Sequence, residues 1–217
     1  MEIEKIVNYQ NDENTYILKS SKKTAVIDPG CDADKIFDIT GDKIDYIILT
    51  HCHFDHIESL RVLKEKTDVK IVFSKTGKSN LNNPDVNLSG MVYGKNIGTE
   101  PDILVADGDF IEFEDFKLKC IETPGHTSCG MCYLVDNNIF SGDTLFNKSI
   151  WRTDFPTGNY SVLEGAVKNK IYTLDDNVTV FPGHGCKTSV GDEKKYNSFI
   201  RGYLWIFFKT DMNVMKK

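Results

Sequence analysis

The chain has 217 residues, of which 40% are hydrophobic and 27% charged, a composition typical of a folded globular protein. Its formal net charge of −6 argues against nucleic acid as the main partner, because phosphate backbones are bound by clustered Lys and Arg. No apolar run approaches the ~20 residues that cross a bilayer, and the N-terminus lacks the layout of a signal peptide. We therefore expect a cytoplasmic protein with reduced cysteines and no membrane partner.

Short strand-like runs and helix-like runs follow one another along the whole chain. Strands are predicted at 16–19, 24–28, 46–49, 69–73, 116–122, 132–135, 138–140 and 178–181. Helices are predicted at 32–40, 57–66, 161–169 and 192 to about 206, with Asp32 and Ser161 as N-caps. The run 46–49 is apolar on successive residues, which indicates a central strand covered on both faces. The Asn-, Gly- and Ser-rich segment 79–99 is predicted to be irregular, a loop over the site.

The segment 51–56, His-Cys-His-Phe-Asp-His, holds three of the five histidines in the chain. In an extended segment the side chains of His51 and His53 point the same way and can hold one metal ion together. If a helical turn begins near Asp55, then Asp55 and His56 project toward the same region. Imidazole and carboxylate suit Zn²⁺ and also Fe or Mn. Four candidate ligands in six residues exceed what one catalytic zinc needs, so the segment predicts two metal ions side by side.

Three more candidate ligands each follow a short apolar strand and a Gly-marked turn: His126, Asp143 and His184. Loops at one edge of a sheet scaffold are where functional sites are usually built, so we expect these residues to converge. Taken alone, Asp143 would be interpreted as a turn-forming Asp, and the histidine motifs are what favour a ligand.

Five ordered motifs now stand out: Ile-Asp-Pro-Gly at 27–30, Thr-His-Cys-His-Phe-Asp-His at 50–56, Pro-Gly-His-Thr at 124–127, Ser-Gly-Asp-Thr-Leu-Phe at 141–146 and Phe-Pro-Gly-His-Gly at 181–185. Together they resemble the metallo-β-lactamase superfamily, from about residue 5 to about residue 200. Within it, the stretch 151–156 and the residues that follow Gly183 resemble the short bacterial glyoxalase II-like hydrolases. Trp151 stands where those proteins usually carry Gly.

The resemblance implies an α/β fold, a four-layer αβ/βα sandwich with a metal site at one edge between its two sheets. It implies two divalent cations, Zn²⁺ as the first choice and Fe or Mn as alternatives. The ligands that it implies are His51, His53 and His126 for the first cation and Asp55, His56 and His184 for the second, with Asp143 bridging the two. Asp55 is also the implied catalytic residue, working with a metal-bound hydroxide.

The activity that follows from the resemblance is hydrolysis of a small acyl thioester. Water held between two cations loses a proton near pH 7, the cations polarise the carbonyl, and thiolate is a good leaving group. Arg152 lies where the glyoxalase II pattern carries a basic residue facing the substrate, and it could pair with a substrate carboxylate. An alternative role for Arg152, rated equally, is a surface or structural salt bridge. A lactone or another ester is a less favoured substrate.

Two other interpretations stay open. The same ligand set serves persulfide dioxygenases, in which one iron uses only two of the histidines and the Asp, and their pattern also carries an Arg-Thr-Asp-Phe stretch like 152–155. Metal content and oxygen uptake would separate this activity from hydrolysis. A metal-bound sensor or scaffold is the non-enzyme alternative, and it is weaker because seven ligands exceed what a structural site needs.

The remaining features are the cysteines and the C-terminal end. Cys129 and Cys132 form a C-x-x-C pair, which admits a redox or third metal site, although burial in the core is favoured. Cys52 is expected to point away from the ligands and pack behind the site. We expect a single domain over 1–217 with an apolar tail at about 201–217, which packs on its own domain or, in the sharper alternative, forms a homodimer contact.

Overall fold

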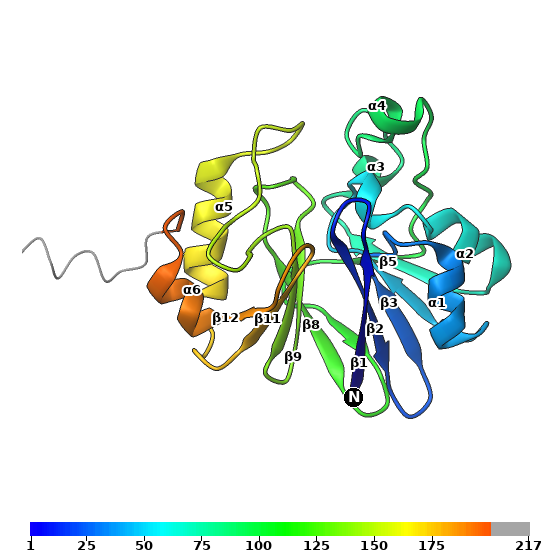
Figure 1. Ribbon diagram of the computed structural model, residues 1–217, viewed down its shortest axis with the longest axis horizontal. Helices are drawn as coiled ribbons and strands as arrows, with labels where there is room; N and C mark the ends of the chain where they lie inside the picture. The colour runs from blue at the N-terminus through cyan, green and yellow to red at the C-terminus, as the bar shows by residue number, and fades with distance from the viewer. Residues whose placement is uncertain (201–217) are drawn as a thin grey trace, which may run out of the picture.

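Two six-stranded sheets pack face to face in the computed structural model, which describes residues 1–200, and helices lie on both outer faces (Figure 1). The first sheet has the order β1 (Glu2–Asn8), β2 (Glu13–Lys19), β3 (Thr24–Ile27), β4 (Tyr46–Ile48), β5 (Lys70–Ser74) and β6 (Ile103–Val105). Strands β3 to β6 are parallel, whereas β1 and β2 form an antiparallel hairpin beside β3. The predicted tail at 201–217, and its dimer contact, lie outside the described residues.

The second sheet has the order β12 (Thr188–Ser189), β11 (Thr179–Pro182), β10 (Asn138–Gly142), β9 (Met131–Val135), β8 (Lys117–Glu122) and β7 (Phe110–Glu112). Only β10 and β11 are parallel, and the other neighbours pair antiparallel. The register of β10 with β11 shifts between Phe140 and Gly142. A shift of this kind bends a strand end and often lies beside a functional site.

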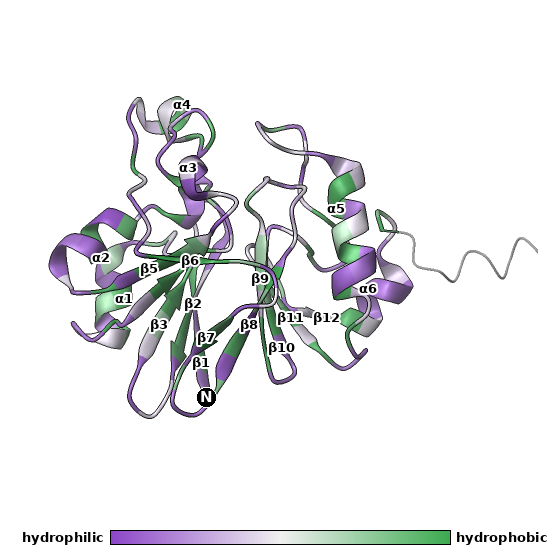
Figure 2. Ribbon diagram, turned by 180° about the vertical axis from the view of Figure 1, so that it is seen from behind, coloured by the Kyte–Doolittle hydropathy of each residue, from purple (hydrophilic) through white to green (hydrophobic). Residues whose placement is uncertain are grey.

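The helices form the two outer layers (Figures 1 and 2). Helices α1 (Ala33–Thr40) and α2 (Leu60–Lys66) cover the first sheet; α5 (Tyr160–Ala166), extended by the π-helical turn Val167–Ile171, and α6 (Val190–Tyr196) cover the second. Two short helices, α3 (Lys78–Leu81) and α4 (Ser89–Tyr93), lie in the segment predicted to be irregular. The architecture is the α/β, αβ/βα sandwich that the motifs implied. Within residues 1–200, no helix is long and apolar enough to span a bilayer.

Three buried apolar clusters separate the four layers. One lies between the first sheet and α1 and α2, one between the two sheets, and one between the second sheet and α5 and α6. The central strand β4 contributes Ile47 to the first of these and Ile48 to the second, and both side chains are fully buried. The prediction of a strand covered on both faces is therefore confirmed. Each such side chain contributes about 1.5–3 kcal/mol through burial.

Several boundaries differ from the sequence prediction. The cap at Asp32 is confirmed, because its side chain accepts from the Asp34 N–H, but Ser161 does not cap α5. Asn159 does, by accepting from the Val162 N–H, because its own N–H is held by the Gly125 carbonyl and fixes an extended backbone there.

Two helices are shorter than predicted. Helix α2 begins at Leu60 rather than at residue 57, because a separate 3₁₀ turn at Phe54–His56 precedes it. Helix α6 ends at Tyr196, where the next residue, Asn197, leaves helical geometry and donates to the Ser149 carbonyl. The sequence pattern also missed β1, β6, β7 and β12. All four are edge strands, and their side chains are mixed or exposed rather than an apolar run.

Asp102 fastens the edge of the first sheet, and its loss should have a pH-dependent cost. Its Oδ2 accepts from the Ile71 N–H at 2.9 Å and from Lys64 Nζ at 2.7 Å. Burial raises the pKa of Asp102, but these donors outweigh it and hold the pKa below 3.8. We expect Asp102→Asn to lower the free energy of unfolding by about 1 kcal/mol at neutral pH.

The sign of this pH dependence follows from the lowered pKa. The stabilisation is fully present above the unfolded-state pKa and is lost as the pH falls through the folded-state pKa. Urea unfolding should therefore show a constant difference between Asp102→Asn and wild type above about pH 5, and a shrinking one below pH 3.8. Asp68→Asn, at an exposed neighbouring position, is the control and should show neither effect. A pH-independent difference would contradict the assignment.

Candidate metal centre

The loops that follow β4, β8, β10 and β11 meet at one edge of the sandwich, between the two sheets. His53 lies in an extended conformation and precedes the 3₁₀ turn at Phe54–His56, as the spacing of segment 51–56 predicted. All seven candidate ligands are brought together there, and six of them are buried: His51, His53, His56, His126, Asp143 and His184. The seventh, Asp55, is partly exposed.

His51, His53 and His126 form the first cluster, with ligand atoms within 4.8 Å of one another. His126 Nε2 lies 2.8 Å from His53 Nδ1. Two ring nitrogens at this distance need either a proton that they share or a cation that both of them bind. The third histidine of the cluster, His51, is placed to bind the same cation. Three imidazoles and an open position form the ligand set of a catalytic zinc.

Asp55, His56 and His184 form the second cluster, again with ligand atoms within 4.8 Å. His56 Nε2 lies 3.3 Å from His184 Nε2, and Asp55 Oδ2 lies 3.5 Å from the same His184 atom. The carboxylate makes this cluster richer in negative charge than the first.

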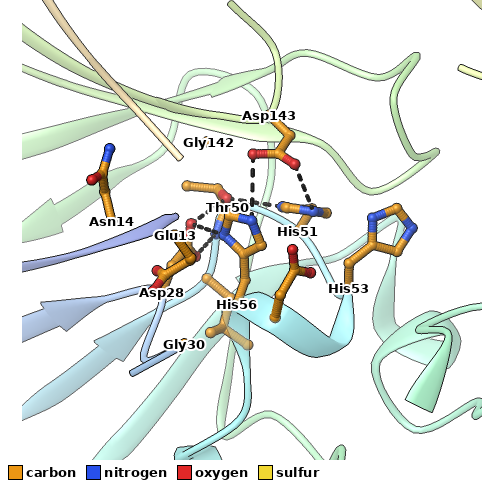
Figure 3. A network of polar contacts seen from close by, with 12 residues as sticks. Glu13, Asn14, Asp28, Gly30, Thr50, His51, His53, His56, Gly142 and Asp143 are labelled. Atoms are coloured by element: carbon orange, nitrogen blue, oxygen red, sulfur yellow. Dashed lines mark hydrogen bonds and ion pairs between the residues drawn. The ribbon is translucent and has the colours of Figure 1, made fainter. Parts of the chain in front are cut away.

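Asp143 lies between the two clusters, above His51 and His56 in Figure 3. Its Oδ1 is 3.3 Å from His56 Nε2, and its Oδ2 is 3.6 Å from His126 Nε2 and 3.7 Å from His184 Nε2. One carboxylate therefore borders ligands of both clusters, which is the geometry that a bridging ligand requires.

Outer hydrogen bonds fix the orientation of four of the five imidazoles. The Nδ1 of His126 donates to the Arg152 carbonyl at 2.7 Å, and the Nδ1 of His184 donates to the Asn11 carbonyl at 3.0 Å. In the neutral form of both rings Nε2 then carries no proton, and it faces the centre. Such outer partners set the tautomer of metal-binding histidines and raise their basicity.

Asp28 fixes the other two rings, His56 and His51, and was not predicted as a site residue from the sequence. Its Oδ1 accepts from the Thr50 N–H, and its Oδ2 accepts from the Thr50 hydroxyl at 2.6 Å and from His56 Nδ1 at 2.9 Å. The Thr50 hydroxyl, with its proton given to Asp28, in turn accepts from His51 Nδ1 at 3.1 Å. Because both of its carboxylate oxygens accept these hydrogen bonds, Asp28 orients the metal ligands and does not itself act as a ligand. Its signal in the sequence was the Asp-Pro-Gly at the end of a strand.

Two glycines allow these groups to approach one another. A Cβ at Gly183 would overlap Asp143 Oδ1 and crowd His56, and a Cβ at Gly142 would overlap the Thr50 side chain. Gly142 also adopts φ +48°, which disfavours other residues. The Gly-marked turns in the sequence are therefore required by close packing around the site.

The two clusters differ in the protonation of their histidines. Burial lowers the pKa of His51 well below 6.5, lowers that of His53 to about 3, and also lowers that of His126. Burial also opposes the charged form of His56, but the carboxylates of Asp143, Asp28 and Asp55 outweigh it and raise the His56 pKa well above 6.5. The first cluster thus offers three neutral imidazoles, ready to bind a cation, whereas the second balances its carboxylates with protons that a cation would replace.

The donor set fits divalent cations on the geometry of the chain itself. Within residues 1–200, three buried atoms of the clusters have no hydrogen-bond partner: His51 Nε2, His53 Nε2 and Asp143 Oδ1. A buried polar atom without a partner costs about 1–3 kcal/mol. Cations would satisfy His51 Nε2 and Asp143 Oδ1, and imidazole and carboxylate suit Zn, Fe and Mn alike.

Glu13 lies beside Asp28 in Figure 3 and was also missed from the sequence. It is fully buried, and its carboxyl oxygens accept from the Thr15 hydroxyl at 3.1 and 3.2 Å. Burial raises the pKa of Glu13 well above 4.5. Gly30 leaves the room that the Glu13 side chain occupies.

The segment 151–155 runs over both clusters. The indole of Trp151 stacks on the His184 ring with centroids 4.8 Å apart and planes 4° from parallel, and the Phe155 ring meets His53 edge-on at 5.7 Å. Arg152 Nε and Nη2 donate to the two oxygens of Asp154 at 2.6 and 2.7 Å. The salt-bridge alternative for Arg152 is therefore observed, and its contact with substrate stays a prediction.

The cysteines confirm the prediction of core packing. Cys129 and Cys132 are fully buried but pack in different apolar clusters, Cys129 in that of the first sheet and Cys132 in that between the second sheet and α5, so they do not form a C-x-x-C site. Cys129 Sγ instead contacts Cys52 Sγ at 3.6 Å, behind the ligands. The groups that could hold a metal within residues 1–200 contain no cysteine.

The fold and the two His/Asp clusters agree with the sequence comparisons. The sequence model of the metallo-β-lactamase superfamily matches residues 9–184, and the chain belongs to this superfamily of metal-dependent enzymes. A probable metallo-hydrolase of Streptococcus pyogenes serotype M6 is 33% identical over 215 residues, which cover 92% of this chain and 90% of that protein. The hydroxyacylglutathione hydrolase GloC of Haemophilus influenzae is 28% identical over 202 residues, covering 85% and 90%.

Solved structures give the same result. The B3 metallo-β-lactamase BLEG-1 superposes with a TM-score of 0.84 at 29% identity, covering 93% of this chain and 100% of that one. ETHE1 from Myxococcus xanthus has a TM-score of 0.77 at 25% identity, covering 100% and 92%. A protein solved in a di-iron-bound form has a TM-score of 0.76 at 28% identity, covering 90% and 98%. The chain is thus similar to proteins with several different names on one scaffold, so its substrate has to be argued from its own site.

Proposed function

We propose that the chain is a dinuclear metallo-hydrolase that cleaves small acyl thioesters, most readily a 2-hydroxyacyl thioester. The observation that carries the proposal is the pair of His/Asp clusters that share Asp143 at an edge of the sandwich. The similarity to the hydroxyacylglutathione hydrolase GloC supports the thioester as substrate.

The ligands proposed for one cation are His51, His53 and His126, and those for the other are Asp55, His56 and His184, with Asp143 between them. When bound, divalent cations supply Lewis-acid chemistry: they polarise the substrate carbonyl and bring the pKa of water near neutrality. Zn²⁺ is the proposed metal, and Fe or Mn would suit the same donors.

The residues of the chain orient the metal ligands and move protons. Asp28 and the Asn11 carbonyl hold His56 and His184 with Nε2 toward the reacting centre. The Asp55 side chain is 15% exposed, against 2% for Asp143, so Asp55 is the carboxylate that reaches the open side of the site. We assign to it the proton that attacking water loses, which it can return to the departing thiolate. The products are then a carboxylate and a free thiol.

Arg152 should affect substrate binding more than turnover. A contact with a remote carboxylate of the thiol carrier is equal in the ground state and the transition state, so its loss raises KM and leaves kcat unchanged. Because the guanidinium is exposed, we expect Arg152→Ala to raise KM roughly two- to fivefold. Asp154→Asn is the matched control: it releases Arg152 from its internal fork and should leave KM unchanged or lower it. A loss confined to kcat would contradict this role.

Two parallel assays test the proposed function. Thiol release from lactoyl thioesters is followed with protein loaded with Zn²⁺, Mn²⁺ or Fe²⁺, and oxygen consumption is followed with a persulfide of a low-molecular-weight thiol. Thiol release well above the metal-free background supports the hydrolase. Oxygen uptake by the iron-loaded protein without thioester turnover would replace it with a persulfide dioxygenase.

A further inference from the structure

A cavity opens beside the candidate metal centre and shares His184 with it. It encloses about 300 Å³ and is walled by Phe146, Trp151 and His184, with Asn11, Asp12 and Cys186 at its rim. We propose that this cavity binds the acyl arm of the substrate and selects an apolar, aromatic acyl group over a small one such as lactoyl. The inference rests on the proposed function.

The cavity is built from stacked rings. The Trp151 indole lies parallel to the His184 imidazole at 4.8 Å, and the Phe146 ring lies 5.1 Å from Trp151 and 6.2 Å from His184. The far face of His184 is thus covered by an aromatic wall while its Nε2 faces Asp55 and Asp143. A substrate group that extends from the centre past His184 meets this aromatic wall.

Charge decides which arm of a thioester enters. Apart from His184, the one acidic or basic side chain among the lining residues is the carboxylate of Asp12; none is Lys or Arg. An anionic thiol carrier is repelled by Asp12 and finds no cation there. The exposed guanidinium of Arg152 lies over the Phe155 ring at 4.1 Å, and Phe155 faces His53 of the other cluster. The charged carrier therefore belongs on the Arg152 side and the uncharged acyl arm on the Trp151 side.

Size and surface decide what kind of acyl arm fits. A volume of about 300 Å³ lies at the lower end of ligand pockets and is far more than a methyl group fills. An aromatic ring packed against the rings of Phe146 and Trp151 gains offset or edge-on contacts worth ~0.5–1.5 kcal/mol beyond burial. That energy corresponds to a preference of roughly two- to twelvefold for an aryl over a methyl group.

Binding of product-like carboxylates tests the cavity without any turnover. The chain has two tryptophans, and Trp205→Phe leaves Trp151 as the only indole. Mandelate and lactate share the 2-hydroxy acid and differ only in phenyl against methyl. We expect mandelate to change the Trp151 fluorescence with a Kd roughly two- to twelvefold lower than that of lactate. Equal affinities, or no response of Trp151 to mandelate, would overturn the proposal.

Turnover of matched thioesters tests the orientation. With one thiol carrier held constant, the ratio of kcat/KM for mandeloyl over lactoyl thioester should exceed one in wild type and fall toward one in Trp151→Gly. Trp151→Phe keeps an aromatic wall and should retain most of the ratio, which separates a lost contact from a misfolded loop. With the acyl group held constant, the preference between an anionic and a neutral carrier should not change in Trp151→Gly. A change in carrier preference alone would reverse the two arms and overturn the proposal.

The two experiments also separate this inference from the proposed function. Selective mandelate binding at Trp151 without thioester turnover supports the cavity and removes the thioesterase. Thioester turnover with no acyl preference in wild type and no effect of Trp151→Gly supports the thioesterase and removes the cavity as its acyl site.

Discussion

His53→Ala and Asp143→Ala should each abolish hydrolysis while the domain stays folded. His53 belongs to the first cluster and Asp143 borders both, so each substitution removes a donor that no neighbour replaces. Losing a ligand weakens several kcal/mol of charge stabilisation, and about 4 kcal/mol corresponds to a thousandfold in rate. We expect kcat/KM to fall by a factor on the order of a thousand or more.

The fold should tolerate both substitutions because these side chains do not hold it together. Within residues 1–200, His53 Nε2 and Asp143 Oδ1 are buried without hydrogen-bond partners. Removing these polar atoms stabilises the metal-free protein and offsets part of the stability lost with the packing of the side chains. Phe140, three residues before Asp143, is fully buried between the sheets, and its ring packs on Tyr16 and Phe181.

The matched control is therefore Phe140→Ala, which should lower the free energy of unfolding by about 3–5 kcal/mol. The two site variants should change it by no more than about 2 kcal/mol in metal-free protein, measured by urea unfolding. Near-normal turnover by either site variant at full metal load would show that the assigned role is wrong.

The local spacing of ligands could be predicted, whereas the groups that orient them could not. His51 and His53 on an extended segment, followed by a turn with Asp55 and His56, depend only on backbone geometry within six residues. Asp28 is separated from His56 by 28 residues, and it reaches His56 because β3 and β4 are parallel neighbours. That pairing is a tertiary fact, so Asp28 carried only the weak signal of a strand end.

The same distinction explains the errors in the fold. Strands with continuous apolar runs, such as β4, were predicted because burial on both faces leaves a pattern in the sequence. The strands β1, β6 and β7 were missed because most of their side chains are exposed or partly exposed, which dilutes the apolar pattern. Ser161 failed as a cap because a backbone contact between Asn159 and Gly125, distant in sequence, decided where α5 begins.

Metal-stripped protein should bind two equivalents of Zn²⁺ per chain, because seven donors form two clusters that are each complete. Isothermal titration and elemental analysis after gel filtration would both show two equivalents. Because the cations bind the folded state, the free energy of unfolding should increase by about 2.7 kcal/mol for each site held at a free metal concentration of 100 Kd. The titration repeated with Mn²⁺ and Fe²⁺ would rank the metals.

Substitutions in one cluster at a time show which cluster binds each equivalent of metal. His184→Ala removes a donor of the second cluster alone, so one tight equivalent should remain and the other should weaken beyond detection. His126→Ala should do the reverse, and Asp143→Ala should weaken both because its carboxylate borders both clusters. Cys186→Ala, two residues from His184 and exposed, is the control and should bind two equivalents. If wild type saturated at one equivalent in excess metal, and His184→Ala bound it equally well, the centre would be mononuclear and Asp55, His56 and His184 would not be ligands.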